Sequence, residues 1–124
     1  MSKRVLIVDD EPNILIAVEF LMRREGHEVI SARDGEAGLV AARIDRPDLI
    51  VLDVMMPKLD GYAVLRAVRA DPDIAATRIL MLTAKNREIA RNKGLTLGAD
   101  AYMPKPFATN DLVDTVRGLL MRAD

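Results

Sequence analysis

Side chains suited to phosphoryl chemistry follow four apolar runs of this sequence. Asp9 and Asp10 come directly after the run VLIV, and Asp53 comes directly after LIVL. Thr83 ends a later run, ILML, and Lys105 follows the last apolar stretch. Together these residues would place a nucleophilic carboxylate, further acids, a hydroxyl and a lysine around one point, which are the groups needed to hold and transfer a phosphoryl group.

The three carboxylates also predict a divalent cation. Crowded together they would repel one another and would require a positive charge between them. An all-oxygen ligand set with room for water suits Mg²⁺ much better than zinc, and Mn²⁺ is its natural substitute. Lys105 would supply a second, fixed positive charge beside the metal.

These residues can meet only if the apolar runs form one parallel sheet. The runs are short, rich in β-branched residues and bounded by polar residues or proline, which is typical of strands buried on both faces. Strand and helix patterns alternate five times, which predicts right-handed βαβ units and an α/β, doubly wound fold with helices on both faces. Because the carboxyl ends of parallel strands share one edge, the chemistry-bearing residues should converge there.

The elements have local start and stop residues. Strands are expected over residues 4–8, 27–32, 49–52, 79–82 and 98–103, the second of them at an edge of the sheet. Pro12 opens the first helix and Gly26 stops it; Asp34, Asp60 and Thr109 cap later helices. The second helix, over 35–45, should face the core with Ala37, Val40, Ala41 and Ile44. The segment 86–97 is weakly amphipathic and contains Gly94, which favours a marginal, mobile helix.

Composition excludes several classes of protein. A chain of 124 residues suits one domain, and with 50% hydrophobic residues, two Phe, two Tyr and no Trp its core must be aliphatic. The net charge of −1 gives no indication of a basic surface that would bind nucleic acid or acidic lipid. The absence of cysteine excludes disulfides, thiolate-zinc sites and thiol nucleophiles. No run is long enough to span a membrane and no secretion signal leads the chain, so the cytoplasm is the expected compartment.

Each candidate residue also has a purely structural interpretation. The acids at positions 9–11 could simply favour a helix N-terminus. Thr83 could satisfy backbone groups, Lys105 could be a solvated surface charge, and Tyr102 could be a packing residue. His27, the only histidine, lies far from the other candidates in this topology and is expected to be structural. The coincidence at four strand ends favours a functional site.

The sequence resembles the receiver domain of two-component response regulators over essentially its whole length. Five ordered motifs carry the resemblance: the acidic pair Asp9-Asp10, Asp53 followed by Met-Met-Pro and Asp60-Gly61, Thr83-Ala84, Gly98-Ala99-Asp100, and Lys105-Pro106-Phe107. The resemblance implies that residues 1–124 form one receiver domain with a flavodoxin-like sheet of order 2-1-3-4-5. It also implies a signalling phosphoacceptor, not an enzyme acting on free substrates.

The resemblance assigns roles at the site. Asp53 would accept a phosphoryl group from the phosphohistidine of a sensor histidine kinase or phosphotransfer protein. Asp10, Asp53 and the Met55 carbonyl would bind Mg²⁺, with Asp9 acting mainly through water. Lys105 would pair with the phosphoryl oxygens, next to a cis Lys105–Pro106 peptide bond.

A conformational switch is implied as well. Thr83 would move to bond the phosphoryl group, Tyr102 would turn inward, and the face of the fourth helix, fifth strand and last helix would exchange partners. Small Ala84 leaves the acceptor open to approach. Met55 and Lys85 lack the carboxylate or amide that could orient an attacking water, which predicts slow self-dephosphorylation.

That switching face could pair two phosphorylated subunits or bind a downstream protein. The residues that could contribute to a dimer face are Arg91, Asp100, Asp111 and Arg117. Ala101 and Thr115, however, stand where an acidic and a basic residue are expected, so one ion pair across the dimer is missing. Kinase specificity would lie in the first helix and nearby loops, at residues such as Asn13, Ile14 and Ala17, and the sequence does not name the kinase or an output domain.

Three other functions compete with this interpretation. A flavin-binding module needs small residues that cradle phosphate after the first strand, where this chain has Asp9-Asp10-Glu11-Pro12. An Mg²⁺-dependent phosphatase with an aspartyl nucleophile usually carries a second acid two residues after the nucleophile, where this chain has Met55. A receiver-like docking module that is not phosphorylated should carry substitutions at the site, and none is present.

Overall fold

The computed structural model describes residues 3–83 and 87–121 and contains alternating strands and helices. The strands are β1 (Arg4–Val8), β2 (Glu28–Ala32), β3 (Leu49–Asp53), β4 (Arg78–Thr83) and β5 (Ala101–Pro104). The helices are α1 (Pro12–Arg24), α2 (Gly35–Asp45), α3 (Gly61–Ala70), α4 (Arg87–Thr96) and α5 (Thr109–Met121). No helix among the described residues is long and apolar enough to cross a membrane.

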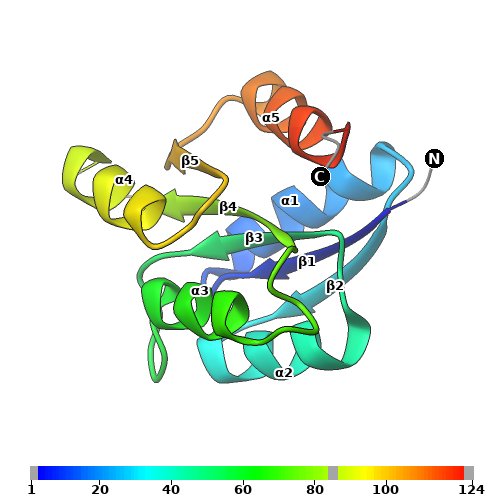
Figure 1. The fold of residues 1–124 in the computed structure, drawn as a ribbon. Coiled ribbons are helices and arrows are strands. Elements are labelled where there is room, and N and C mark those ends of the chain that lie inside the picture. The colour runs from blue at the N-terminus through cyan, green and yellow to red at the C-terminus, as the bar shows by residue number, and fades with distance from the viewer. Residues whose placement is uncertain (1–2, 84–86, 122–124) are drawn as a thin grey trace.

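The strands form one all-parallel sheet of order β2-β1-β3-β4-β5, which confirms the predicted doubly wound α/β fold. Helices α1 and α5 cover one face, and α2, α3 and α4 cover the other (Figure 1). The chain places β2 on one side of β1, and then β3, β4 and β5 on the other side. The crevice expected for a ligand in this topology therefore lies at the carboxyl ends of β1 and β3.

Side chains of the central strands alternate between the two cores. Val5, Ile7 and Val51 pack with α1 and α5, whereas Leu6 and Ile50 belong to the cluster with α2 and α3. This alternation is the geometry of a strand. Because both faces are covered, the buried runs are continuously apolar, as their sequences predict.

Helix boundaries follow local chemistry. The carboxylates of Asp34 and Asp60 accept hydrogen bonds from the backbone N–H groups of Ala37 and Ala63, so both predicted N-caps are confirmed. At the end of α1, Gly26 takes a φ of 88°, which a residue with a side chain rarely adopts. The prediction that Thr109 caps the last helix is wrong by one residue, because α5 begins at Thr109 and the Ala108 carbonyl accepts its first hydrogen bond.

The predicted inner face of α2 is wrong at Ala37, Val40 and Ile44, whereas Ala41 does pack, half-buried, against the core. Val40 and Ile44 are 54% and 73% exposed, and the helix instead buries Gly35, Gly38 and Ala42. A Cβ on Gly38 would lie 2.7 Å from a methyl carbon of Val8, so the glycine lets α2 approach the sheet closely. The helix therefore docks mainly through its smallest residues, with Leu39 partly buried beside them, and leaves Val40 and Ile44 outside.

Candidate functional site

The carboxyl ends of β1 and β3 bring three carboxylates together. One carboxylate oxygen from each of Asp9, Asp10 and Asp53 lies within 4.8 Å of the others. Asp9 and Asp53 are 1% and 3% exposed, whereas Asp10 is exposed. Two buried like charges at this distance are unfavourable unless a positive charge is near them.

Lys105 supplies that charge from the loop after β5. Its Nζ lies 2.8 Å from Asp9 Oδ2, 3.0 Å from Glu11 Oε1 and 3.3 Å from Asp53 Oδ1. The side chain is only 6% exposed. The Lys105–Pro106 peptide bond is cis, as the resemblance implies, and the Lys105 N–H donates to the Thr83 carbonyl at 2.8 Å.

The electrostatics of the cluster depend on burial. Burial first, and then the nearby charge of Asp9, raise the pKa of Asp53 to about 7 against the opposing effect of Lys105. For Lys105, burial alone would lower the pKa, but hydrogen bonds to Asp9 and Glu11 and the charge of Asp53 outweigh it and raise the pKa. Lys105 is therefore firmly cationic, and a metal-free Asp53 gains or loses its proton near neutral pH.

Backbone hydrogen bonds fix the position of Asp53. The residue pairs with Leu82 in the sheet register, and the next N–H, of Val54, donates to the Leu82 carbonyl at 3.0 Å. Oδ1 of Asp53 accepts from Met55 N at 3.4 Å. No hydrogen bond or ion pair among residues 3–83 and 87–121 reaches its other oxygen, Oδ2. One carboxylate oxygen is thus held and the second remains available to a ligand.

The proposed switch residues share one face of the sheet. Thr83 is 1% exposed and follows Ile79 and Met81 on the side covered by α4. Tyr102 is half-buried against the same cluster and pairs with Met81 in the register of β4 and β5. Asp9, Asp53 and Thr83 therefore end neighbouring strands, with Tyr102 on the adjoining edge strand.

Some predicted residues lie outside the described part of the chain. Residues 84–86 are not described, which leaves Ala84 and Lys85 without a structural test. The backbone of Arg91 belongs to α4, but its side chain is likewise not described.

Two residues of the expected dimer face are engaged within the chain. Asp100 Oδ2 accepts from Arg69 Nη2 and from the Ile79 N–H, both at 2.8 Å. The guanidinium of Arg117 holds both carboxylate oxygens of Glu25, at 2.6 and 3.0 Å. Asp111 is exposed and lines a groove of about 380 Å³ with Tyr102, Phe107 and other residues of β5 and α5.

Sequence reasoning missed two residues that organise the site and its support. Glu11 reaches Lys105, although its position in the sequence predicts only an acid near a helix terminus. Arg69 donates to the carbonyls of Gly98, Ala75 and Thr77 and to Asp100. Its position at the inner edge of an amphipathic helix was the only available indication, and many exposed arginines share that pattern.

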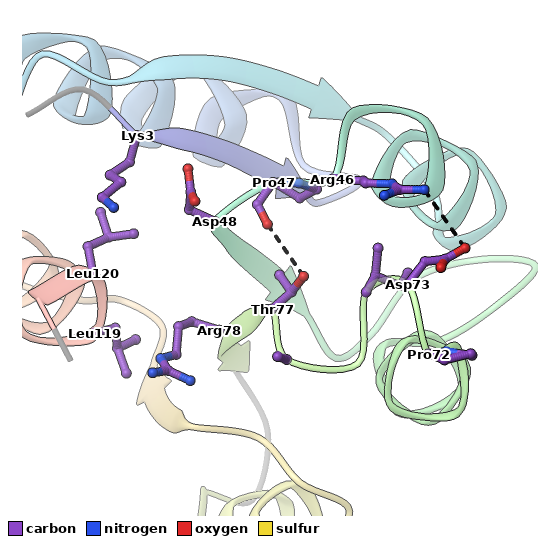
Figure 2. Close-up of a pocket in the computed structure, with 12 residues that line it drawn as sticks. Lys3, Arg46, Pro47, Asp48, Pro72, Asp73, Thr77, Arg78, Leu119 and Leu120 are labelled. Atoms are coloured by element: carbon purple, nitrogen blue, oxygen red, sulfur yellow. Dashed lines mark hydrogen bonds and ion pairs between the residues drawn. The ribbon is translucent and has the colours of Figure 1, made fainter. Parts of the chain in front are cut away.

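A second hollow, of about 300 Å³, lies at the opposite end of the sheet. Figure 2 shows Lys3, Asp48 and Arg78 around it, next to the amino ends of β1, β3 and β4. The Arg46–Asp73 ion pair, at 3.8 Å, and a hydrogen bond from Thr77 Oγ1 to the Pro47 carbonyl, at 3.4 Å, also border it. The acidic cluster is at the carboxyl ends of the strands, so this hollow is no part of it.

The sequence is similar to those of transcriptional regulators. Residues 5–117 match the family described as the response regulator receiver domain. The chain is 45% identical over 124 residues to the alkaline phosphatase synthesis transcriptional regulatory protein PhoP of Bacillus subtilis (strain 168), covering 100% of this chain and 51% of that protein. It is 45% identical over 123 residues to the probable transcriptional regulator ycf27 of Cyanophora paradoxa, covering 99% and 50%. The chain thus spans about half the length of these relatives.

Solved structures agree with the sequence comparison. A putative response regulator from Chloroflexus aurantiacus J-10-fl superimposes with a TM-score of 0.93 at 36% identity, covering 98% of this chain and 100% of the other. The chemotaxis response regulator CheY4 of Vibrio cholerae gives a TM-score of 0.90 at 34% identity, covering 96% and 99%. With the fold, the acidic cluster and the matched sequence in agreement, the chain belongs to the response regulator receiver domain family.

Proposed function

We propose that this domain accepts a phosphoryl group on Asp53 from a phosphohistidine of a sensor histidine kinase or phosphotransfer protein. The observation that carries the proposal is the placement of Lys105, whose Nζ lies 3.3 Å from Asp53 Oδ1 while Oδ2 is left available. A nucleophilic oxygen beside a buried cation is what an incoming anionic phosphoryl group requires.

The transfer is a simple exchange of bonds. An oxygen of Asp53 attacks phosphorus, the phosphorus–nitrogen bond of the donor breaks, and the donor histidine keeps the electron pair and becomes protonated. The product carries up to two further negative charges in a site that already holds acids. Lys105 would turn toward the phosphoryl oxygens, and this new contact would offset the loss of its contact with the Asp53 carboxylate.

The acidic cluster fits a resident Mg²⁺, because its ligands are all oxygens and two of its carboxylates are buried with only one lysine to balance them. Asp10, Asp53 and the Met55 carbonyl would hold the ion, with Asp9 acting mainly through water. When bound, the ion would neutralise charge that develops on the phosphoryl oxygens. Mn²⁺ presents the same preference for oxygen ligands.

The output would pass through the face formed by α4, β5 and α5. Thr83 and Tyr102 lie on the same side of the sheet, which supports a coupled movement of the two. The relatives named above are transcriptional regulators, so a downstream domain or protein that controls transcription is the output we infer. Pairing of two phosphorylated domains through this face would require Arg117 to leave Glu25 and Asp100 to share its carboxylate with a partner.

A phosphatase is the competing function. It would use the same carboxylate and metal but needs an acid two residues after the nucleophile, where the exposed Met55 stands. Hydrolysis of an added phosphomonoester with many turnovers per protein would support that function and contradict ours.

Intact-mass spectrometry after incubation with Mg²⁺ and acetyl phosphate tests the proposal. One added phosphoryl group is expected for the wild type and none for Asp53→Asn or for protein treated with a chelator. Asp73→Asn, an exposed acid far from the cluster, is the matched control and should behave as wild type. An adduct that persists in Asp53→Asn would contradict the assignment of the acceptor.

The lifetime of the adduct tests the roles given to Met55 and Lys85. We expect slow self-dephosphorylation because neither side chain carries the carboxylate or amide that could orient an attacking water. Met55→Asn should shorten the lifetime severalfold in the same mass assay. Decay of the wild type within seconds, unaffected by that substitution, would contradict this expectation.

A further inference from the structure

Helix α2 carries an apolar stripe that the fold leaves outside. The stripe consists of Ala37, Val40, Ala41 and Ile44, at the spacing i, i+3, i+4 and i+7. Val40 is 54% exposed and Ile44 73%, whereas Ala37 is exposed and Ala41 is half-buried. This spacing usually marks the face by which a helix packs against another element. Here Ala37, Val40 and Ile44 face away from the core, and Ala41 lies at the margin, partly packed against it.

The position of the stripe leaves it accessible. Arg43 forms an ion pair with Asp71, just after α3, at 3.2 Å, and this contact marks the side of α2 that faces α3. Successive helix residues turn by about 100°, so Ala37 and Ile44 project away both from α3 and from the buried residues of α2. Figure 1 shows α2 and α3 side by side, with the far side of α2 uncovered by any other helix.

We propose that this stripe is a contact surface between two copies of this chain, with their α2 helices antiparallel about a twofold axis. The stripe alternates small and large residues, so it is complementary to itself when reversed. An antiparallel partner would place Ala37 against the partner's Ile44, and Val40 against the partner's Ala41. An interface of this kind uses the same surface on both subunits, as twofold dimers do.

The charges beside the stripe favour the same arrangement. Glu36 and Arg43 flank one side of it, two helical turns apart, and both are exposed. Glu36 makes no ion pair with the rest of the described chain. In an antiparallel pair Glu36 would lie near the partner's Arg43, and this contact would occur twice.

The dimer should be weak and independent of phosphorylation. One pair of short helices buries less surface than a standard stable interface, so association should appear only at high protein concentration. The stripe lies on the face of the sheet opposite α5 and contains none of the residues of the acidic cluster. Asp53→Asn should therefore dimerise as the wild type does.

Sedimentation velocity of the unphosphorylated chain, from micromolar to millimolar concentration, tests the surface. The wild type should sediment faster as its concentration rises. Val40→Glu and Ile44→Glu should weaken association at least about tenfold. Both sites are exposed, so an unchanged urea midpoint should show that the fold survives. The control is Ile16→Glu, because Ile16 of α1 is equally apolar and 66% exposed; it should leave association unchanged.

Charge reversal tests the orientation. Glu36→Arg should weaken the dimer by about two- to thirtyfold, the range expected when two exposed ion pairs are lost, and adding Arg43→Glu should restore it. Arg43→Glu alone is the control for the loss of the Arg43–Asp71 ion pair. A double variant no tighter than either single variant would contradict the antiparallel arrangement. A wild type that stays monomeric at millimolar concentration would overturn the proposal. If Val40→Glu then slowed phosphoryl transfer from a kinase, the stripe would instead belong to a kinase contact.

Discussion

The carboxylate of Glu11 lies 3.0 Å from Nζ of Lys105, on the same nitrogen that contacts Asp9 and Asp53. Glu11 is 56% exposed, whereas the other two acids are buried. Glu11 is therefore the most accessible of the three anions. Exchanging the Lys105–Glu11 contact for a contact with a phosphoryl oxygen should cost the least free energy.

Replacing this anion should make Lys105 more available. We expect Glu11→Gln to accumulate phosphorylated protein at least as fast as the wild type, since one competitor for the ammonium group is removed. Lys105→Met should slow accumulation at least about a hundredfold, the size of effect that removal of a group stabilising transition-state charge usually has. The measurement is the rate of adduct formation with acetyl phosphate at saturating Mg²⁺. A tenfold or greater loss in Glu11→Gln would show that Glu11 helps to build the site.

The raised pKa of Asp53 predicts how stability depends on pH without metal. The pKa rises from 3.8 in the unfolded chain to about 7 in the folded one. The folded state therefore binds this proton more tightly, so the contribution of Asp53 to stability is full below pH 4 and is lost as pH rises through about 7. In chelator, Asp53→Asn should raise the free energy of unfolding at pH 8 by roughly 2 kcal/mol and change it little at pH 4.

Magnesium should reverse that effect. At pH 8 the ion should raise the melting temperature of the wild type, because it binds the folded state and not the unfolded one. The rise should be much smaller in Asp53→Asn and Asp10→Asn, and unchanged in Asp73→Asn. Equal stabilisation of all four proteins would contradict a metal site at the acidic cluster.

Arg69 should contribute to stability more than any exposed arginine of its helix. Arg69→Met would leave the carbonyls of Ala75, Thr77 and Gly98 without this donor and Asp100 without its ion pair. Unsatisfied buried acceptors cost about 1–3 kcal/mol each, with part recovered by water, so we expect a loss of roughly 2–4 kcal/mol in urea unfolding. Arg66→Met, at an exposed position of α3, should cost less than about 0.5 kcal/mol.

His27 should oppose folding at mildly acidic pH. Burial lowers its pKa below 6.5, although the charge of Glu25 raises it in part, and Nδ1 accepts from the Lys3 N–H at 3.3 Å. The unfolded chain therefore binds the proton more tightly, and stability should fall as pH drops below about 6.5. The Asp53→Asn substitution removes the increase in stability that Asp53 gives at low pH. In that background, His27→Gln should reduce the dependence of the free energy of unfolding on pH. An unchanged slope would mean that other groups titrate there.

Most of the fold and the position of the cluster could be predicted from the sequence. Each buried strand is a short apolar run, and each ends in a residue that cannot be buried without a partner. A parallel sheet then has only one edge at which Asp9, Asp53 and Lys105 can lie. Local residues such as Asp34 and Asp60 set helix starts because their side chains act on backbone groups within the same turn.

Tertiary structure decided what local pattern left open. Helix α2 has two apolar faces, and close approach to Val8 at Gly38 selected the smaller one, which exposed Val40 and Ile44. The sequence predicts that Asp100 and Arg117 could serve as charges for a partner subunit, yet Arg69 and Glu25 hold them within the chain. Such pairings join residues far apart in sequence. Their energies depend on distances and burial that no periodicity encodes, so only the packed chain could determine them.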